Sequence, residues 1–249
     1  MPRIECNCEK IEKGGMSLRT EIEKIRDQAI VSLDDAHDYF THTKYAWRSL
    51  QQGVQRDGVK LSWRNFSTNL TVNEREISGR AQRYVQVELT SSTLQQFVSI
   101  FENFLSDTAC AWLLAHPGSL SKRQLSGKEI LRLPDKAAIV NALVAKELRE
   151  VFYDRPANWF AALKELVNIP SPNAAECEQF AEIKATRDVL VHGQGVANAY
   201  YSEKAGKVAR VHSGEPLDIT ETYHQRSWEL IRKLVVNIGT EMAEKAQDV

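Results

Sequence analysis

The stretch SSTLQQFVSIFENFLSDTACAWLLA, from Ser91 to Ala115, decides the class of fold. Its apolar residues recur at spacings of three and four, which is the period of a helix with one apolar face. The following HPGS, at 116–119, ends the helix because proline and glycine interrupt the pattern. The apolar face comprises Leu94, Phe97, Val98, Phe101, Phe104, Leu105, Trp112 and Leu113. A face this wide predicts a helix at the centre of the protein.

The same period predicts helices on both sides of the central one, so the expected fold class is mainly all-α, a helical bundle. The other expected helices run from Ser17 to about Gln52, as one helix or two; from Asp135 to Phe152; from Ala157 to Val167; from Ser171 as N-cap, with Pro172 at the first helical position, to Gly193; and onward from about Thr220.

The segment from Gly53 to Leu89 has a different composition, rich in Gly, Asn, Ser and Thr. Its short alternations, KLSWRNF at 60–66 and YVQVEL at 84–89, predict strands or extended chain, and the segment at 200–220 is expected to form a short hairpin or loop. We therefore divide the chain into a disordered N-terminus at 1–16, an N-terminal helical and extended extension at 17–90, and a helical bundle at 91–249.

Composition sets limits on function. With 249 residues, 43% of them hydrophobic, the chain can bury a full core. A net charge of -1 excludes a globally basic nucleic-acid binder but allows a local basic face. The longest apolar run, ACAWLLA at 109–115, is too short to span a bilayer, so we expect a cytoplasmic protein with no membrane partner. The four cysteines form no disulfide framework, and reduced thiols are expected.

The segment RDVLVHGQG, from Arg187 to Gly195, is the chemically unusual part of the sequence. On a helical wheel Arg187 falls in the middle of an apolar face. Burying an unpaired charge there would cost several kcal/mol. The arginine therefore requires a carboxylate or a phosphate. The apolar residues of that face are Phe180, Ile183, Leu190 and Val191.

His192 ends the same segment and is four residues after Asp188, which places the two side chains where they can pair. Asp188 is then expected to orient the imidazole and favour its protonated form. Arg187 and His192 are about 140° apart around the helix, so one straight helix cannot direct both at one atom. A shared site needs either a break in the helix before His192 or two copies of the helix, related by a two-fold axis through the face that carries Phe180, Ile183 and Arg187; the apolar residues of that face favour the second.

The arrangement of Arg187, Asp188, His192 and a glycine stop near the end of a helix resembles the Rx4-6H signature of the HEPN superfamily, over about 91–249. The resemblance implies a homodimeric, metal-independent endoribonuclease without a cofactor, with a composite cleft, acting as a toxin or in antiviral defence. Its implied partners are RNA and an antitoxin or defence protein. Gln194 stands where the tyrosine-modified branch of these toxins has its tyrosine, so that mode of regulation is not expected.

These observations lead to two hypotheses of different classes. In the first, His192 is the base or acid of RNA cleavage, Arg187 stabilises charge on the phosphoryl oxygens and Asp188 tunes the histidine. In the second, the chain is a non-catalytic helical module that binds RNA or a protein.

Two basic stretches are candidates for RNA contact. Arg64, Arg80 and Arg83 alternate with Trp63, Phe66 and Tyr84, as on a surface that stacks bases; the alternative is a solvated face with its aromatic rings in the core. Lys122 and Arg123 form the second basic stretch. His212 and His224 have no carboxylates at metal-ligand spacing, so no metal site is predicted and both are expected to be solvated.

Overall fold

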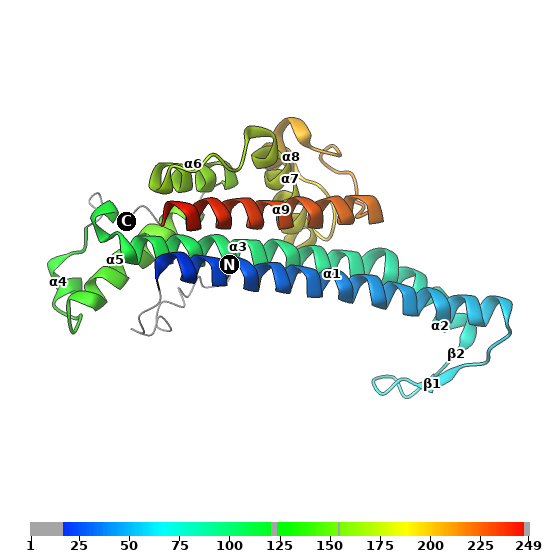
Figure 1. The fold of residues 1–249 in the computed structure, drawn as a ribbon. Helices are drawn as coiled ribbons and strands as arrows, with labels where there is room; N and C mark the ends of the chain where they lie inside the picture. Colours follow the sequence, from blue (N-terminus) through cyan, green and yellow to red (C-terminus); the bar gives the residue numbers. More distant parts are fainter. Residues whose placement is uncertain (1–16, 121–123, 154, 247–249) are drawn as a thin grey trace.

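A computed structural model describes residues 17–120, 124–153 and 155–246. It confirms a mainly α-helical fold (Figure 1). None of the helices in these ranges is long and apolar enough to cross a membrane. Cys110 is disulfide-bonded and Cys177 is free, so the expectation of reduced thiols is wrong for Cys110.

Three long helices lie side by side and form the centre of the molecule: α1 (Leu18–Arg56), α3 (Thr90–Ala115) and α9 (Glu221–Lys245). In Figure 1, α1 runs in one direction and α3 and α9 return along it. Their facing side chains, among them Leu33, Phe97 and Ile231, are buried in one hydrophobic cluster. The apolar face predicted for 91–115 is buried throughout and is thus the centre of this core.

The predicted division at residue 90 does not correspond to a break in this core. Ile22, Leu33 and Ala36 of α1 belong to the same cluster as the residues of α3 and α9. The boundary also falls inside a continuous helical run, in which α2 (Glu74–Arg83), a π-helical segment (Tyr84–Leu89) and α3 follow one another. Helix α1 is therefore part of the bundle and not an appendage to it.

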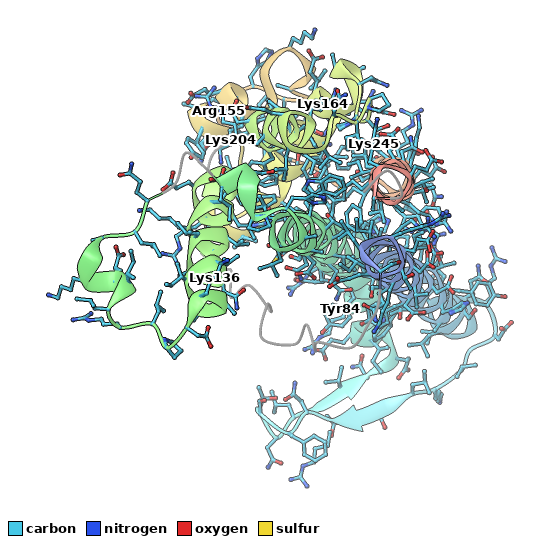
Figure 2. The ribbon with its side chains drawn as sticks, turned by 60° about the vertical axis from the view of Figure 1, so that its left-hand side comes forward. Tyr84, Lys136, Arg155, Lys164, Lys204 and Lys245 are labelled. Carbon is cyan, nitrogen blue, oxygen red and sulfur yellow. The ribbon has the colours of Figure 1, made fainter. Side chains whose placement is uncertain are left out.

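Residues 57–73 form a β-hairpin between α1 and α2, as the sequence predicted for its first half. Strand β1 (Ser62–Arg64) pairs antiparallel with β2 (Thr71–Asn73), and the hairpin projects from the helical body (Figures 1 and 2).

The prediction of extended chain for YVQVEL was wrong. A strand would place Val85, Val87 and Leu89 on one face, but Val85 and Leu89 are buried while Val87 is 54% exposed, and this pattern is that of a helix.

The remaining helices cover α3 and α9 on the other sides. Helix α5 (Lys136–Tyr153) packs on α3 through Val144 and Leu148, with the short α4 (Gly127–Ile130) and the 3-10 turn Pro117–Leu120 beside it. Helices α6 (Pro156–Val167) and α7 (Ala174–His192) pack on α3, where Phe160 and Phe180 surround Phe101.

The ends of α7 are set by local chemistry. The N-cap is Asn173, in a capping box with Glu176, and not the predicted Ser171, because the Asn173 side chain accepts from the Glu176 amide while Glu176 accepts from the Asn173 amide. Gly193 ends the helix as predicted. The chain then forms α8 (Ala199–Ala205) and a 3-10 turn (Gly206–Val208) before α9, which begins near the predicted position and has Thr220 as its N-cap.

Candidate functional site

The three residues singled out as catalytic all lie in the last two turns of α7. The Arg187 side chain is 13% exposed and that of Asp188 is 20% exposed. His192 is the last helical residue and is exposed. The motif therefore combines a nearly buried guanidinium with a histidine that solvent and partners can reach.

The anion that Arg187 was predicted to need is a carboxylate of the same chain. One terminal nitrogen of its guanidinium donates to Oε2 of Glu102, on α3, and the other is 3.1 Å from Oδ1 of Asp188. The Nε of Arg187 is buried without an acceptor among the described residues. The guanidinium is thus paired through its terminal nitrogens, and its Nε–H is unused within the described part of the chain.

Two lysines join these groups in what we term the charge cluster: Glu102, Lys184, Arg187, Asp188 and Lys204. Nζ of Lys184 lies 2.9 Å from Glu102 Oε1, and Nζ of Lys204 lies 3.3 Å from Asp188 Oδ2. Three cations face two carboxylates, so the cluster carries a net charge of +1 (3 − 2) from these five residues. An excess of positive charge in a partly buried site favours an anionic ligand.

The structure does not bring Asp188 and His192 together. The Asp188 carboxylate is occupied by Lys184, Arg187 and Lys204, and His192 has no hydrogen bond within the part of the chain described. The predicted orienting role of Asp188 toward His192 is therefore wrong for this chain in isolation. Four-residue spacing makes a pair possible, but three cations compete for the same carboxylate.

The dimer face predicted around Phe180 and Ile183 is also wrong. Both side chains are buried in the chain's own core, 0% and 4% exposed, so they are unavailable to a partner. The large apolar side chains that do remain exposed near the motif are Val191, Val196 and Tyr200, at 46%, 43% and 60%. They lie on both sides of His192 in the sequence, so the chain at the end of α7 leaves apolar side chains exposed.

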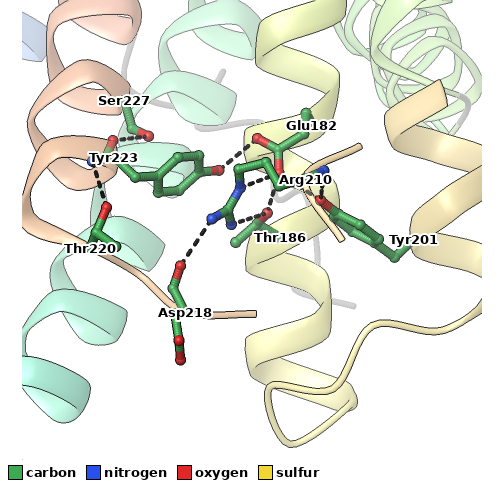
Figure 3. Close-up of polar contacts among 8 residues, drawn as sticks. All are labelled: Glu182, Thr186, Tyr201, Arg210, Asp218, Thr220, Tyr223 and Ser227. Atoms are coloured by element: carbon green, nitrogen blue, oxygen red, sulfur yellow. Dashed lines mark hydrogen bonds and ion pairs between the residues drawn. The ribbon is translucent and has the colours of Figure 1, made fainter. Parts of the chain in front are cut away.

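A second polar group, missed in the sequence, holds the chain after α7 in place (Figure 3). The buried Glu182 carboxylate accepts from Tyr201, Arg210 and Tyr223 at 2.8–2.9 Å, and from Thr186. Arg210 also donates to the carbonyl of Asp218 and stacks on the Tyr223 ring at 3.6 Å. This network fastens α8, the 206–218 segment and α9 to α7.

The acid-base properties of this network suit a structural role. Burial raises the pKa of Tyr223 and of Tyr201, so both phenols stay protonated as donors. Burial alone would lower the pKa of Arg210, but Tyr223 and Glu182 raise it above its ordinary value. A signal for the network was present in the sequence, because Glu182 and Thr186 are polar and four residues apart on the inner face of α7.

The predicted RNA-binding residues have different environments. Arg80 pairs with Glu76 at 2.6 Å and Arg83 with Glu88 at 3.1 Å, so both arginines have partners within the chain. Arg64, on β1, has no ion pair with any described residue. Lys122 and Arg123 lie outside the described residues. Of the aromatic rings, Tyr84 packs against Trp47 and Phe66 is fully exposed.

His212 and His224, considered above as a possible pair, lie in different environments. His212 is exposed, but His224 is fully buried, which contradicts the expectation that it is solvated. Within the ranges that the structure describes, no three His, Cys, Asp or Glu side chains gather in a way that could hold a metal ion.

Comparison with known proteins finds no match: no family model, no curated protein and no solved structure matches this chain.

Proposed function

We propose that this protein is a metal-independent endoribonuclease of HEPN type, which works as a homodimer on cytoplasmic RNA. The observation that carries the proposal is the end of α7, where an exposed, unpaired His192 follows a partly buried cluster of net charge +1 that contains Arg187. An accessible imidazole at the end of the helix that also carries an excess of positive charge suits proton transfer at a phosphate.

The proposed reaction is an attack of the RNA 2′-hydroxyl on the adjacent phosphorus. The 2′-oxygen forms a bond to phosphorus and gives its proton to one His192, while the bond to the 5′-oxygen breaks and that oxygen takes a proton from the other His192. Arg187 stabilises the charge that develops on the phosphoryl oxygens. The products are a 2′,3′-cyclic phosphate and a 5′-hydroxyl.

A dimer supplies the two imidazoles. Val191, Val196 and Tyr200 are exposed and near His192 in the sequence, and an isologous contact through the end of α7 would bring the same histidine from both chains together. For a phosphate to reach Arg187 it has to replace a carboxylate oxygen of Glu102 or Asp188. A role in toxin systems or antiviral defence follows from the family resemblance.

One observation favours the second hypothesis, a non-catalytic module. Both terminal nitrogens of Arg187 are already held by carboxylates of the same chain, which is what a purely structural arginine would show.

Cleavage of end-labelled single-stranded RNA in excess EDTA tests the proposal. We expect His192→Ala to lower the cleavage rate by about a hundredfold or more, because general acid-base groups contribute about that factor. Arg187→Lys should remain inactive, since an ammonium lacks the two-point contact of a guanidinium. The matched control is His42→Ala, which removes an exposed histidine from α1. Undiminished cleavage by folded His192→Ala would reject the mechanism, and no cleavage by the wild type would favour the non-catalytic module.

A further inference from the structure

The hairpin between α1 and α2 places a phenylalanine in solvent at its tip. Phe66 is 100% exposed and Leu70 is 66% exposed. The hairpin stands away from the helical body (Figure 2), so the body leaves the tip uncovered. An exposed phenyl ring contributes nothing to the folded state through burial, so its face is free to stack on a ligand.

The tip is held in a defined shape by its own hydrogen bonds. The Asn65 side chain accepts from the amides of Ser67 and Thr68 at 2.9 and 3.1 Å. The backbone amide of Asn65 donates to the carbonyl of Leu70, and the backbone amide of Asn69 donates to the carbonyl of Asn65, both at 2.8 Å. Because these bonds fix the backbone on both sides of Phe66, the ring is presented without a further ordering cost for the loop.

The charge of the hairpin is mainly positive, and Asp57 at its base is its one acidic residue. Residues 58–73 contain Lys60 and Arg64 and no acidic residue. Neither cation has an ion pair among the residues that the structure describes, in contrast to Arg80 and Arg83 on the helix that follows. Both charges lie on the same hairpin as the exposed ring and are therefore available to an anionic ligand that contacts the hairpin.

We infer that this hairpin is a binding element for single-stranded RNA, in which a base stacks on Phe66 and the adjoining phosphates meet Arg64 and Lys60. Stacking on an aromatic ring combined with phosphate contacts is the usual way of binding single strands without sequence preference. The tip surrounds Phe66 with Asn65, Ser67 and Thr68, which suit a hydrated polyanion, whereas insertion into a bilayer would strip these polar groups of water. The inference rests on the proposed function for RNA as the natural ligand, and it extends the substrate contacts beyond the end of α7.

Binding is measured without cleavage by using the full chain with His192→Ala as the parent. Affinity is measured by fluorescence anisotropy of a short labelled oligouridine. We expect Phe66→Ala to bind it at least about fivefold more weakly than the parent, since one stacked base contributes that much or more. Phe66→Trp should bind it as well as the parent, because the larger ring also stacks. Arg64→Gln should reduce the slope of log affinity against log salt by about one phosphate contact. Leu131→Ala, a change at another exposed apolar residue at 88%, is the control and should have no effect.

The outcomes separate this inference from the proposed function. If the parent and the Phe66→Ala variant bind the oligouridine with equal affinity, or if the parent does not bind it at all, the inferred role of the hairpin is overturned. Binding that depends on Phe66, in a protein whose wild type does not cut RNA, supports the hairpin and rejects the nuclease. Cosedimentation with phosphatidylserine vesicles, together with no affinity for RNA, would reassign the hairpin to a membrane surface and overturn the inference.

Discussion

His224 shows how one residue can couple the core to pH. It is fully buried between the rings of Phe40 and Phe97, and its Nε2 is 2.6 Å from the hydroxyl of Thr93. Thr93 gives its hydroxyl proton to the carbonyl of Leu89, so Nε2 is the protonated nitrogen, and Nδ1 is buried without a partner. A proton on Nδ1 would have no acceptor. Burial accordingly lowers the pKa of His224 from 6.5 to about 3.

This shift predicts a loss of stability in mild acid. Between pH 6.5 and about 3 the unfolded chain binds a proton at His224 that the folded chain does not, so the stabilisation is fully present above 6.5 and falls as the pH drops. From pH 7 to pH 5 the wild type should lose about 2 kcal/mol more unfolding free energy than His224→Gln, measured in urea. His42→Gln, at an exposed site, should keep the wild-type pH dependence; an equal loss in all three proteins would contradict the prediction.

At the candidate site, the sequence predicted the need of Arg187 for an anion but not the identity of that anion. Helical periodicity places the arginine on an apolar face, and this much is a local property of α7. Glu102 precedes Arg187 by 85 residues and lies on another helix, so only the packing of α3 against α7 reveals the pair. The pairing of the Asp188 carboxylate with Lys204 of α8 is likewise visible only once the two helices are packed together.

At the scale of the element, glycine marks where helices come closest. Gly239 of α9 is buried, and a methyl group at this position would lie 2.7–2.9 Å from the side-chain carbons of Arg26 on α1. That side chain is anchored, because Arg26 bonds to Asp27 and to Thr240. By contrast, a methyl group at Gly79 of α2 would meet nothing within 4 Å.

The two glycines therefore predict opposite effects of one substitution. Gly79→Ala should stabilise the protein by up to about 1 kcal/mol, because alanine has the higher helix propensity. Gly239→Ala gains the same propensity but overpacks the contact between α1 and α9, for a net loss of about 1 kcal/mol or more. Urea unfolding of the two variants checks both signs, and stabilisation by Gly239→Ala would show that Arg26 moves aside freely.

The elements of this protein were predictable to the extent that their apolar residues repeat over many turns. The central helix and the helix from Thr220 were found near their observed ends. The π-helical segment was not, because YVQVEL viewed alone also alternates; the period of four appears only when Ile77 and Ala81 of α2 are included. The capping box at Asn173 and Glu176 was also readable, but Ser171 and Pro172 formed a competing start signal.

At the scale of the whole molecule, non-local packing decided what the sequence could not. The composition of 53–89 suggested a boundary near residue 90, yet α1 lies along both α3 and α9 and shares their core. Chain order alone does not show that the first helix packs against the last. The same holds for assembly, because Phe180 and Ile183 are apolar enough for an interface but are used inside the chain. At the motif, the apolar side chains that the described residues leave exposed include Val191, Val196 and Tyr200.

A shared site between two chains can be tested by mixing subunits. If each cleavage event needs His192 from both chains, a heterodimer of wild type and His192→Ala is inactive. Equimolar mixing then leaves about one quarter of the activity of the same total amount of wild type, since about one quarter of the dimers are wild-type pairs. If each chain carries its own complete site, about one half remains. RNA cleavage after co-refolding of the two proteins distinguishes one quarter from one half.

A variant that cannot form the proposed dimer tests whether assembly is needed for cleavage. Val191 is 46% exposed and outside the core, so Val191→Lys should leave the free energy of unfolding nearly unchanged while placing like charges opposite each other across the two-fold axis. We expect this variant to be a monomer in light scattering and to have lost RNA cleavage, although its His192 and Arg187 are intact. A monomeric Val191→Lys that cuts RNA at the wild-type rate would show that one chain is sufficient, and would exclude the composite site.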